Sequence, residues 1–189
     1  MPPKAKFTKE EVICAALDIL RVHGKEGLTA RALGQKLGSS ARPIFTLFSG
    51  MDEIFREAER AAQALYNEYV EAGLRESIPF KGVGRSYLRF AKEEPKLFQL
   101  FFFEERKATK GDVLFVIEEN YRVILNSIVA FYRIDIERAR ELYFHNWVYT
   151  HGIASLIATG MCAFSEEECD AMLTTMFKGL YRELGGAGI

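Results

Sequence analysis

Hydrogen-bond donors gather between residues 29 and 46 of this chain. They comprise two arginines, one lysine and four hydroxyl side chains, namely Thr29, Arg31, Lys36, Ser39, Ser40, Arg42 and Thr46. Arginine and lysine pair with phosphate, hydroxyl groups donate to phosphate or to base edges, and arginine can donate two parallel hydrogen bonds to O6 and N7 of guanine. The chemistry that this set predicts is recognition of nucleic acid, not the making or breaking of bonds.

These donors need a scaffold, and the same stretch predicts two short helices joined by a tight turn. Apolar residues recur at helical spacing in both, as Ala32, Leu33 and Leu37 and then as Ile44, Phe45 and Phe48. Gly38 suits the end of the first helix, because glycine enters the left-handed conformation at little cost. Ser39 or Ser40 can cap the second helix. This is the helix-turn-helix pattern, whose second helix can lie in a DNA major groove.

Arg42 is the residue that we expect to read a base, because it lies early on the predicted second helix. A phosphate contact and a solvated arginine are the alternatives. Its neighbour Ala41 can meet a thymine methyl group. Thr29 can cap the first short helix, and the N–H groups that it leaves there can also face a phosphate. Arg31 and Lys36 are phosphate partners or ordinary exposed helix charges.

The charge distribution agrees with a nucleic-acid contact at one end. The whole chain has a formal charge of −1, but residues 1–50 hold eight Lys and Arg against four acids, which is +4. The remainder, with 17 basic and 22 acidic residues, is therefore −5. A basic end on an acidic body is typical of proteins that meet phosphate at that end, although ordinary surface scatter gives a similar excess.

Several function classes find no support in the sequence. Three scattered cysteines, Cys14, Cys162 and Cys169, predict neither a disulfide framework nor a metal site. The chain shows no signal peptide and no apolar run long enough for a membrane span, so we expect a cytoplasmic protein. No catalytic motif, phosphate loop or cofactor fingerprint is present, so neither an enzyme nor a cofactor is predicted.

Helical patterns continue to the end of the chain and predict an all-α fold of about nine helices. The first helix runs from Thr8 to about Val22 and ends at Gly24, with Thr8 and Glu11 as a capping box. Later helices are expected over Met51 to about Leu74, Pro79 to about Glu94, a short stretch from Pro95, Asp112 to about Phe131, Asp135 to about Thr159, and from Ser165 to the Gly-rich tail. We place the boundary between an N-terminal unit, 1–50, and a C-terminal bundle, 51–189, at the start of the long helix.

Aromatic residues concentrate in the predicted C-terminal bundle. Candidates for the lining of a cavity for an apolar or aromatic molecule are Phe90, Phe98, Phe102, Tyr121, Phe144, Trp147 and His151. The alternative is that these rings fill an ordinary helical core. His151 follows Trp147 by four residues on the same helical face, where it can contact a ligand or a buried backbone group.

The last two long helices carry more apolar residues than a monomeric bundle needs. These are Ile153, Leu156, Ile157 and Met161 on one helix, and Met172, Leu173, Met176, Phe177 and Leu180 on the other. Packing of both helices on their symmetry mates predicts a homodimer with a four-helix interface. A monomer core is the other interpretation.

Taken together, these residues resemble the TetR family of transcriptional regulators. The similarity lies in the glycine-ended first helix, Thr29, the turn Gly38-Ser39-Ser40, and Met51-Asp52-Glu53-Ile54, and, in NWVYTHGIASL, in a Trp…His-Gly signature of one subgroup. The resemblance implies a three-helix DNA-binding domain, a linking fourth helix, and a C-terminal bundle that binds an effector and dimerises. It further implies a repressor that binds double-stranded operator DNA at a palindromic site.

Three positions depart from that family pattern. Phe45, Leu47 and Met51 stand where the family often has Tyr, a polar or aromatic residue such as His, and Lys, respectively. Those side chains commonly meet phosphate, and each lost cationic contact lowers affinity and flattens its salt dependence. Lys4, Lys6 and Lys9 can compensate as a basic arm. The alternative function is therefore a ligand-binding or protein-interaction module with weakened or lost DNA binding.

Overall fold

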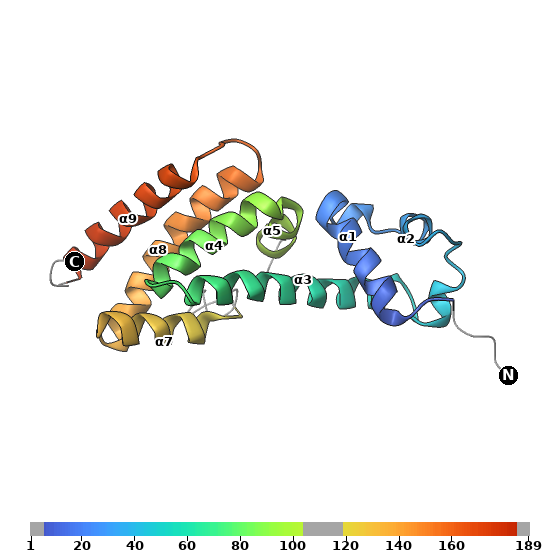
Figure 1. Ribbon diagram of the computed structural model, residues 1–189, viewed down its shortest axis with the longest axis horizontal. Coiled ribbons are helices and arrows are strands. Elements are labelled where there is room, and N and C mark those ends of the chain that lie inside the picture. The colour runs from blue at the N-terminus through green and yellow to red at the C-terminus, as the bar shows by residue number, and fades with distance from the viewer. Residues whose placement is uncertain (1–5, 104–118, 185–189) are drawn as a thin grey trace.

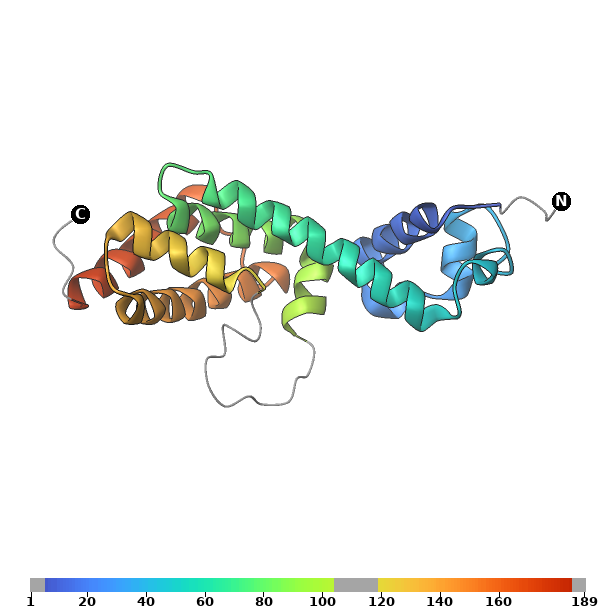
Figure 2. The same ribbon diagram turned by 90° about the horizontal axis from the view of Figure 1, so that it is seen from below.

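A computed structural model describes residues 6–103 and 119–184, and within these ranges every regular element is a helix. The helices are α1 (Lys9–Gly27), α2 (Ala30–Lys36), the short 3₁₀ helix η1 (Ile44–Thr46), α3 (Met51–Leu74), α4 (Pro79–Glu93), α5 (Pro95–Phe102), α7 (Tyr121–Tyr132), α8 (Ile136–Ala158) and α9 (Glu166–Glu183). The molecule is elongated, with α1 and α2 at one end, α7, α8 and α9 at the other, and α3 reaching into both (Figures 1 and 2). None of the described helices is both long and apolar enough to cross a membrane.

The N-terminal unit is built on α1 and its predicted capping box. The Thr8 hydroxyl accepts from the Glu11 N–H at 3.1 Å, and the Glu11 carboxylate accepts from the Thr8 N–H at 2.8 Å. The regular helical geometry of α1 ends at Gly24, as predicted, where φ is 69° and ψ is −169°. After this kink one more turn continues to Gly27. Val12, Ala16 and Leu20 are fully buried on its inner face.

The second short helix of the predicted motif is much shorter than the sequence suggests. After α2, Gly38 adopts a φ of 61° and the Ser39 N–H donates to the Gly34 carbonyl at 2.8 Å, so the expected glycine turn is present. The following segment forms only η1, and neither Ser39 nor Ser40 caps it. The hydrogen bonds of this segment are mixed: the N–H of Thr46 bonds three residues back, to the Pro43 carbonyl at 3.3 Å, whereas the N–H of Phe48 bonds four residues back, to the Ile44 carbonyl at 3.3 Å.

Helix α3 joins the two units, as predicted for the long fourth helix. It packs against α1 near its start and against α4 along its second half (Figures 1 and 2). Ile54, Ala58 and Ala62 are fully buried along one face, which Tyr66 and Val70 continue. One apolar stripe at helical spacing therefore serves both units.

The C-terminal bundle surrounds α4, which contacts α3, α5, α7, α8 and α9. The predicted caps of the later helices are confirmed. The Asp135 carboxylate accepts from the Arg138 N–H at 2.9 Å, and Ser165 forms a capping box with Glu168. Helix α7 is confirmed from Tyr121 onward, whereas its predicted start at Asp112 lies outside the described residues.

The α3–α4 hairpin depends on two glycines that meet where the helices cross. A Cβ placed on Gly82 would lie 2.2 Å from the Gly73 carbonyl oxygen, and one on Gly73 would lie 2.6 Å from the Gly82 carbonyl. Real atoms do not approach so closely, so only glycine at both positions allows this contact.

We therefore expect Gly82→Ala to lower the free energy of unfolding by about 1–3 kcal/mol, as overpacking does. Helix propensity alone predicts the opposite sign, a gain of up to about 1 kcal/mol. Chemical denaturation of the variant and of the parent chain decides the matter, and a more stable variant would contradict this close contact.

Candidate functional site

The predicted nucleic-acid residues lie on one solvent-facing region at the α2–η1 end. Six of them are exposed to solvent in addition to Phe45, and Ser39 and Ala41 are half-buried; the exposed six are Thr29, Arg31, Lys36, Ser40, Arg42 and Thr46. Within the described residues, no carboxylate forms an ion pair with Arg31 or Arg42. Two guanidinium groups are therefore available to a negatively charged partner.

Several other donors in this region are already engaged within the chain. Lys36 forms an ion pair with Asp18 at 2.8 Å. The Thr29 hydroxyl accepts from the Ala32 N–H at 3.1 Å, which confirms its capping role, and the Thr46 hydroxyl donates to the Pro43 carbonyl at 2.7 Å. Lys6 donates to the Ser39 hydroxyl at 3.0 Å, so this lysine lies against the turn, whereas Lys4, also expected in the basic arm, lies outside the described residues.

The three positions that depart from the family pattern differ in exposure. Phe45 is 41% exposed, whereas Leu47 and Met51 are half-buried and pack against the core. At the start of α3, Glu53 accepts hydrogen bonds from the backbone and the hydroxyl of Ser49, which lowers the pKa of its carboxyl to about 2. Lys9 pairs with that carboxylate at 3.3 Å. The Glu53 carboxylate therefore partly neutralises the charge of Lys9, and the start of α3 attracts a phosphate less strongly than Lys9 alone would.

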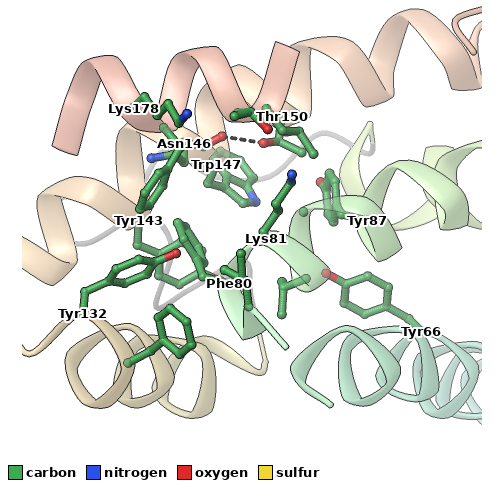
Figure 3. A pocket seen from close by; sticks show the side chains of 17 residues that line it. Tyr66, Phe80, Lys81, Tyr87, Tyr132, Tyr143, Asn146, Trp147, Thr150 and Lys178 are labelled. Atoms are coloured by element: carbon green, nitrogen blue, oxygen red, sulfur yellow. Dashed lines mark hydrogen bonds between the residues drawn. The ribbon is translucent and has the colours of Figure 1, made fainter. Parts of the chain in front are cut away.

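A cavity of about 300 Å³ lies between α4, α7, α8 and α9, with Tyr66 of α3 at its edge (Figure 3). Its described lining is mainly aromatic and aliphatic: Tyr66, Ile78, Phe80, Lys81, Val83, Gly84, Tyr87, Phe131, Tyr132, Tyr143, Asn146, Trp147, Thr150, Leu173, Thr174, Phe177 and Lys178. Walls of this kind, with a few polar groups, are typical of sites for small organic molecules.

Of the seven residues predicted to line a cavity, the structure places only Trp147 in the described lining. Phe90 and Phe98 are fully buried, and with Phe102 they pack against Tyr66 or Tyr87 in an aromatic cluster. Tyr121 is buried and stacks on Tyr143 with ring centroids 5.5 Å apart, so it supports the wall from behind. Phe144 is 39% exposed on the outer side of α8.

His151 also lies behind the wall. Its ring stacks on that of Trp147 at 4.9 Å, and its Nδ1 atom lies 2.9 Å from the Tyr87 hydroxyl. Burial lowers the pKa of His151, because the charged imidazolium loses its hydration. The neutral ring therefore holds two lining residues, Trp147 and Tyr87, in place.

Most of the lining residues that sequence reasoning missed come from α4, α8 and α9, which are distant in the chain; Tyr66 of α3 and Phe131 and Tyr132 of α7 were missed as well. Phe80, Gly84 and Tyr87 follow one face of α4, Tyr143 and Thr150 share a face of α8, and Thr174, Phe177 and Lys178 belong to α9. Helical spacing predicts that each set points inward. Only the packing of the helices shows that these faces leave space between them.

Polar atoms in the cavity are few. The Asn146 amide donates to the Leu142 carbonyl at 2.8 Å, and the Thr150 hydroxyl donates to the Asn146 carbonyl at 2.7 Å. The Trp147 indole nitrogen is buried and has no hydrogen-bond partner among the described residues. A buried N–H without an acceptor is unfavourable, so this site gains from a ligand that supplies one.

One ion pair connects the cavity-bearing bundle to the N-terminal unit. Arg21 of α1 donates through Nε to Glu94 at 2.8 Å and through Nη2 to the other carboxylate oxygen. Glu94 is 3% exposed and stands between α4 and α5. A buried carboxylate needs such a partner, so α1 and the end of α4 are held together.

The buried neutral His151 predicts a dependence of stability on pH. In the unfolded chain its pKa returns to about 6.5, so the unfolded state takes up a proton first as the pH falls. The free energy of unfolding is therefore not reduced by this histidine well above about pH 6.5, and it declines as the pH falls below that value. We expect Tm to fall between about pH 7.5 and 5.5, with His151→Gln showing a smaller decline. His23→Gln, an exposed histidine, is the matched control. An unchanged pH profile in His151→Gln would contradict this assignment.

Comparisons with known proteins agree with the arrangement of the helices. Two transcriptional regulators from Rhodococcus sp. RHA1, one described as TetR-like, share the fold with TM-scores of 0.66 and 0.63 at 14% and 16% identity. The alignments cover 99% and 94% of this chain and 100% and 97% of those chains. The multidrug binding protein EbrR, solved with imidazole, has a TM-score of 0.53 at 17% identity, covering 89% of this chain and 88% of its own. No curated protein matches the sequence.

The family is shown by the C-terminal bundle itself. Residues 80–180, more than half of the chain, match the family described as tetracyclin repressor-like, C-terminal domain. These residues include α4, α8 and most of α9, which together provide most of the cavity lining. The chain therefore belongs to the TetR family of transcriptional regulators.

Proposed function

We propose that this TetR-family chain is a dimeric repressor in which a small apolar or aromatic effector in the cavity controls binding to a palindromic DNA operator. The observation that carries the proposal is the path of α4. This helix contributes Phe80, Gly84 and Tyr87 to the cavity and ends beside Glu94, which binds Arg21 of α1. A ligand that moves α4 therefore acts on the helix that anchors the N-terminal unit.

The exposed donors of the N-terminal unit support the DNA-binding part of the proposal. Arg42 lies just before η1, with its guanidinium exposed and without a carboxylate partner in the described part of the chain. Arg31 and Ser40 lie on the same end of the molecule. We assign this role to the unit that spans residues 1–50, and effector binding and dimerisation to residues 51–189.

The aromatic walls of the cavity support the effector part. A ligand changes an equilibrium between two conformers only as far as its affinity for them differs. Lining residues come from α4, α7, α8 and α9, so a bound molecule contacts four helices at once. A conformer that fits the ligand better and holds the N-terminal units at a different separation then binds the operator less well. The fold relative EbrR is named for multidrug binding, in line with a cavity of this kind.

The outer side of α8 supports the dimer. Phe144 and Val148 are 39% and 50% exposed, and a Cβ added at Gly152 would meet open space. These residues are spaced by four and form one stripe along the helix, which a second copy can cover closely. By contrast, Ile153 and Leu173, which we expected at the interface, are buried within the subunit.

The proposal predicts an operator that can be found without knowledge of the regulated genes. Selection of duplexes from a random DNA pool is expected to give a two-fold symmetric site, with half-sites about 34–36 Å apart. Arg42→Ala is expected to weaken binding to the selected site by about 1–3 kcal/mol and to relax its specificity. Arg60→Ala, on the exposed side of α3, serves as a control of equal charge change. An unchanged affinity of the Arg42 variant would remove Arg42 from the interface.

Failure to enrich any site at low salt would favour the second candidate function, a ligand-binding or protein-interaction module with lost DNA binding. The observations that favour it are the apolar Phe45 and the half-buried Leu47 and Met51, which supply no phosphate contact.

The dimer proposal is tested by Val148→Glu. A carboxylate at the centre of an apolar stripe must lose its hydration to be covered, so we expect the variant to be a monomer at concentrations where the parent chain is a dimer. Sedimentation velocity measures this directly. The matched control, Val123→Glu on α7, replaces a valine of similar exposure outside the stripe. A dimeric Val148→Glu variant, or a monomeric parent chain, would contradict the proposed interface.

A further inference from the structure

The cavity has an uneven charge. Its described lining contains two lysines, Lys81 and Lys178, and neither aspartate nor glutamate. Tyr132 does not alter this balance, because burial and the nearby Tyr181 raise the pKa of its phenol to about 12 and keep it neutral. The formal charge that the described walls present to a ligand is therefore positive.

The two lysines are not equivalent. Lys81 already pairs with Asp170 at 2.9 Å, and Asp170 also binds Arg85 at 2.6 Å. Lys178 forms no ion pair within the described residues and is exposed at the edge of the cavity. Figure 3 shows it on the same side of the cavity as Asn146 and Trp147. The uncompensated positive charge therefore belongs to Lys178.

Trp147 also lines the cavity, and its indole nitrogen has no acceptor among the described residues. Figure 3 draws this nitrogen on the side of the ring that faces Lys81, away from Lys178. The ammonium of Lys178 is therefore the donor of the described lining that is left to pair with a negatively charged group at this edge. No described lining residue offers a carboxylate to a cationic ligand.

Most of the remaining lining is apolar or aromatic. Phe80 packs edge-on against Tyr143 at 5.7 Å, and Tyr132 lies 4.9 Å from Phe177 between ring centroids. Phe131 and Ile78 extend this surface, and both are partly open to solvent. A ligand that fills the cavity therefore has an apolar body in contact with these rings.

We propose that the effector is an amphiphilic anion, an apolar body with one carboxylate that binds the Lys178 ammonium. This inference rests on the effector site proposed above and names its chemical class. Lys178 is the specificity-determining residue, because its ammonium is the positive charge of the described lining that no carboxylate neutralises.

The test uses three probes that share one apolar body, namely 4-cyclohexylbutanoate, its primary amide, and 4-cyclohexylbutylamine. None of them absorbs where tryptophan does, and Trp147 is the only tryptophan of the chain, so its fluorescence reports the cavity directly. Titration of the full chain is expected to give a Kd for the carboxylate about five- to tenfold lower than for the amide, with the amine weakest.

Two variants locate the preference. Lys178→Gln is expected to raise the Kd of the carboxylate to that of the amide and to leave the amide unchanged, whereas Lys92→Gln, an exposed lysine outside the lining, keeps the preference.

Each negative outcome of these titrations overturns a different claim. Equal affinities for the carboxylate and the amide in the parent chain, or tightest binding of the amine, would overturn the anion inference and leave the effector site standing. A preference that survives Lys178→Gln would overturn the assignment to Lys178. Absence of binding by all three probes would overturn both the inference and the effector site, while DNA binding by the N-terminal unit would still be judged by its operator.

Discussion

The Glu94 carboxylate is the buried charge around which the two halves of this molecule are arranged. It stands where α4 gives way to α5, and it reaches the guanidinium of Arg21 on α1. Removal of one partner from a buried pair leaves a charge without compensation, which costs about 3–5 kcal/mol. Arg21 is half-exposed, so this value is an upper bound for the pair. The N-terminal unit is therefore tied to the end of α4 as well as to α3, and the two helices cannot change their relative positions without affecting α1.

The cavity lies on the other part of the same helix. Phe80, Gly84 and Tyr87 face it, and the Gly73–Gly82 contact fixes the first turn of α4 against α3. Because no side chain separates the helices there, a displacement of α4 has to pivot close to that contact. Its far end, beside Glu94, then moves most. The aromatic cluster of Phe98, Phe101 and Phe102 on α5 packs against Tyr66 or Tyr87 and stiffens the same region. These contacts give a physical route from a bound effector to α1.

Local signals in the sequence predicted most of the helices well. Capping residues such as Thr8, Asp135 and Ser165 satisfy backbone groups within a few positions of themselves, so they are visible without knowledge of the fold. The predicted second helix of the motif is too long, because the Thr46 N–H bonds to the carbonyl three residues back and the segment around Ile44 forms only one 3₁₀ turn. The sequence predicted an aromatic cavity in the C-terminal bundle, but most of the residues predicted to line it lie elsewhere. Aromatic spacing on α5 indicates burial, and whether a buried ring faces another ring or a space depends on three other helices. The charge of Lys178 and the missing partner of Trp147 emerge only once α8 and α9 are placed beside α4.

The central claim is that the cavity and the DNA-binding surface are energetically coupled. Linkage requires that an effector which weakens operator binding be bound less tightly when the operator is present, by the same factor. The most direct measurement is a titration of Trp147 fluorescence with 4-cyclohexylbutanoate, without DNA and with a saturating amount of the selected operator duplex. Our account predicts a Kd that is higher by about 5- to 150-fold in the presence of the operator. The same Kd in both titrations would show that the two sites are independent and would contradict it.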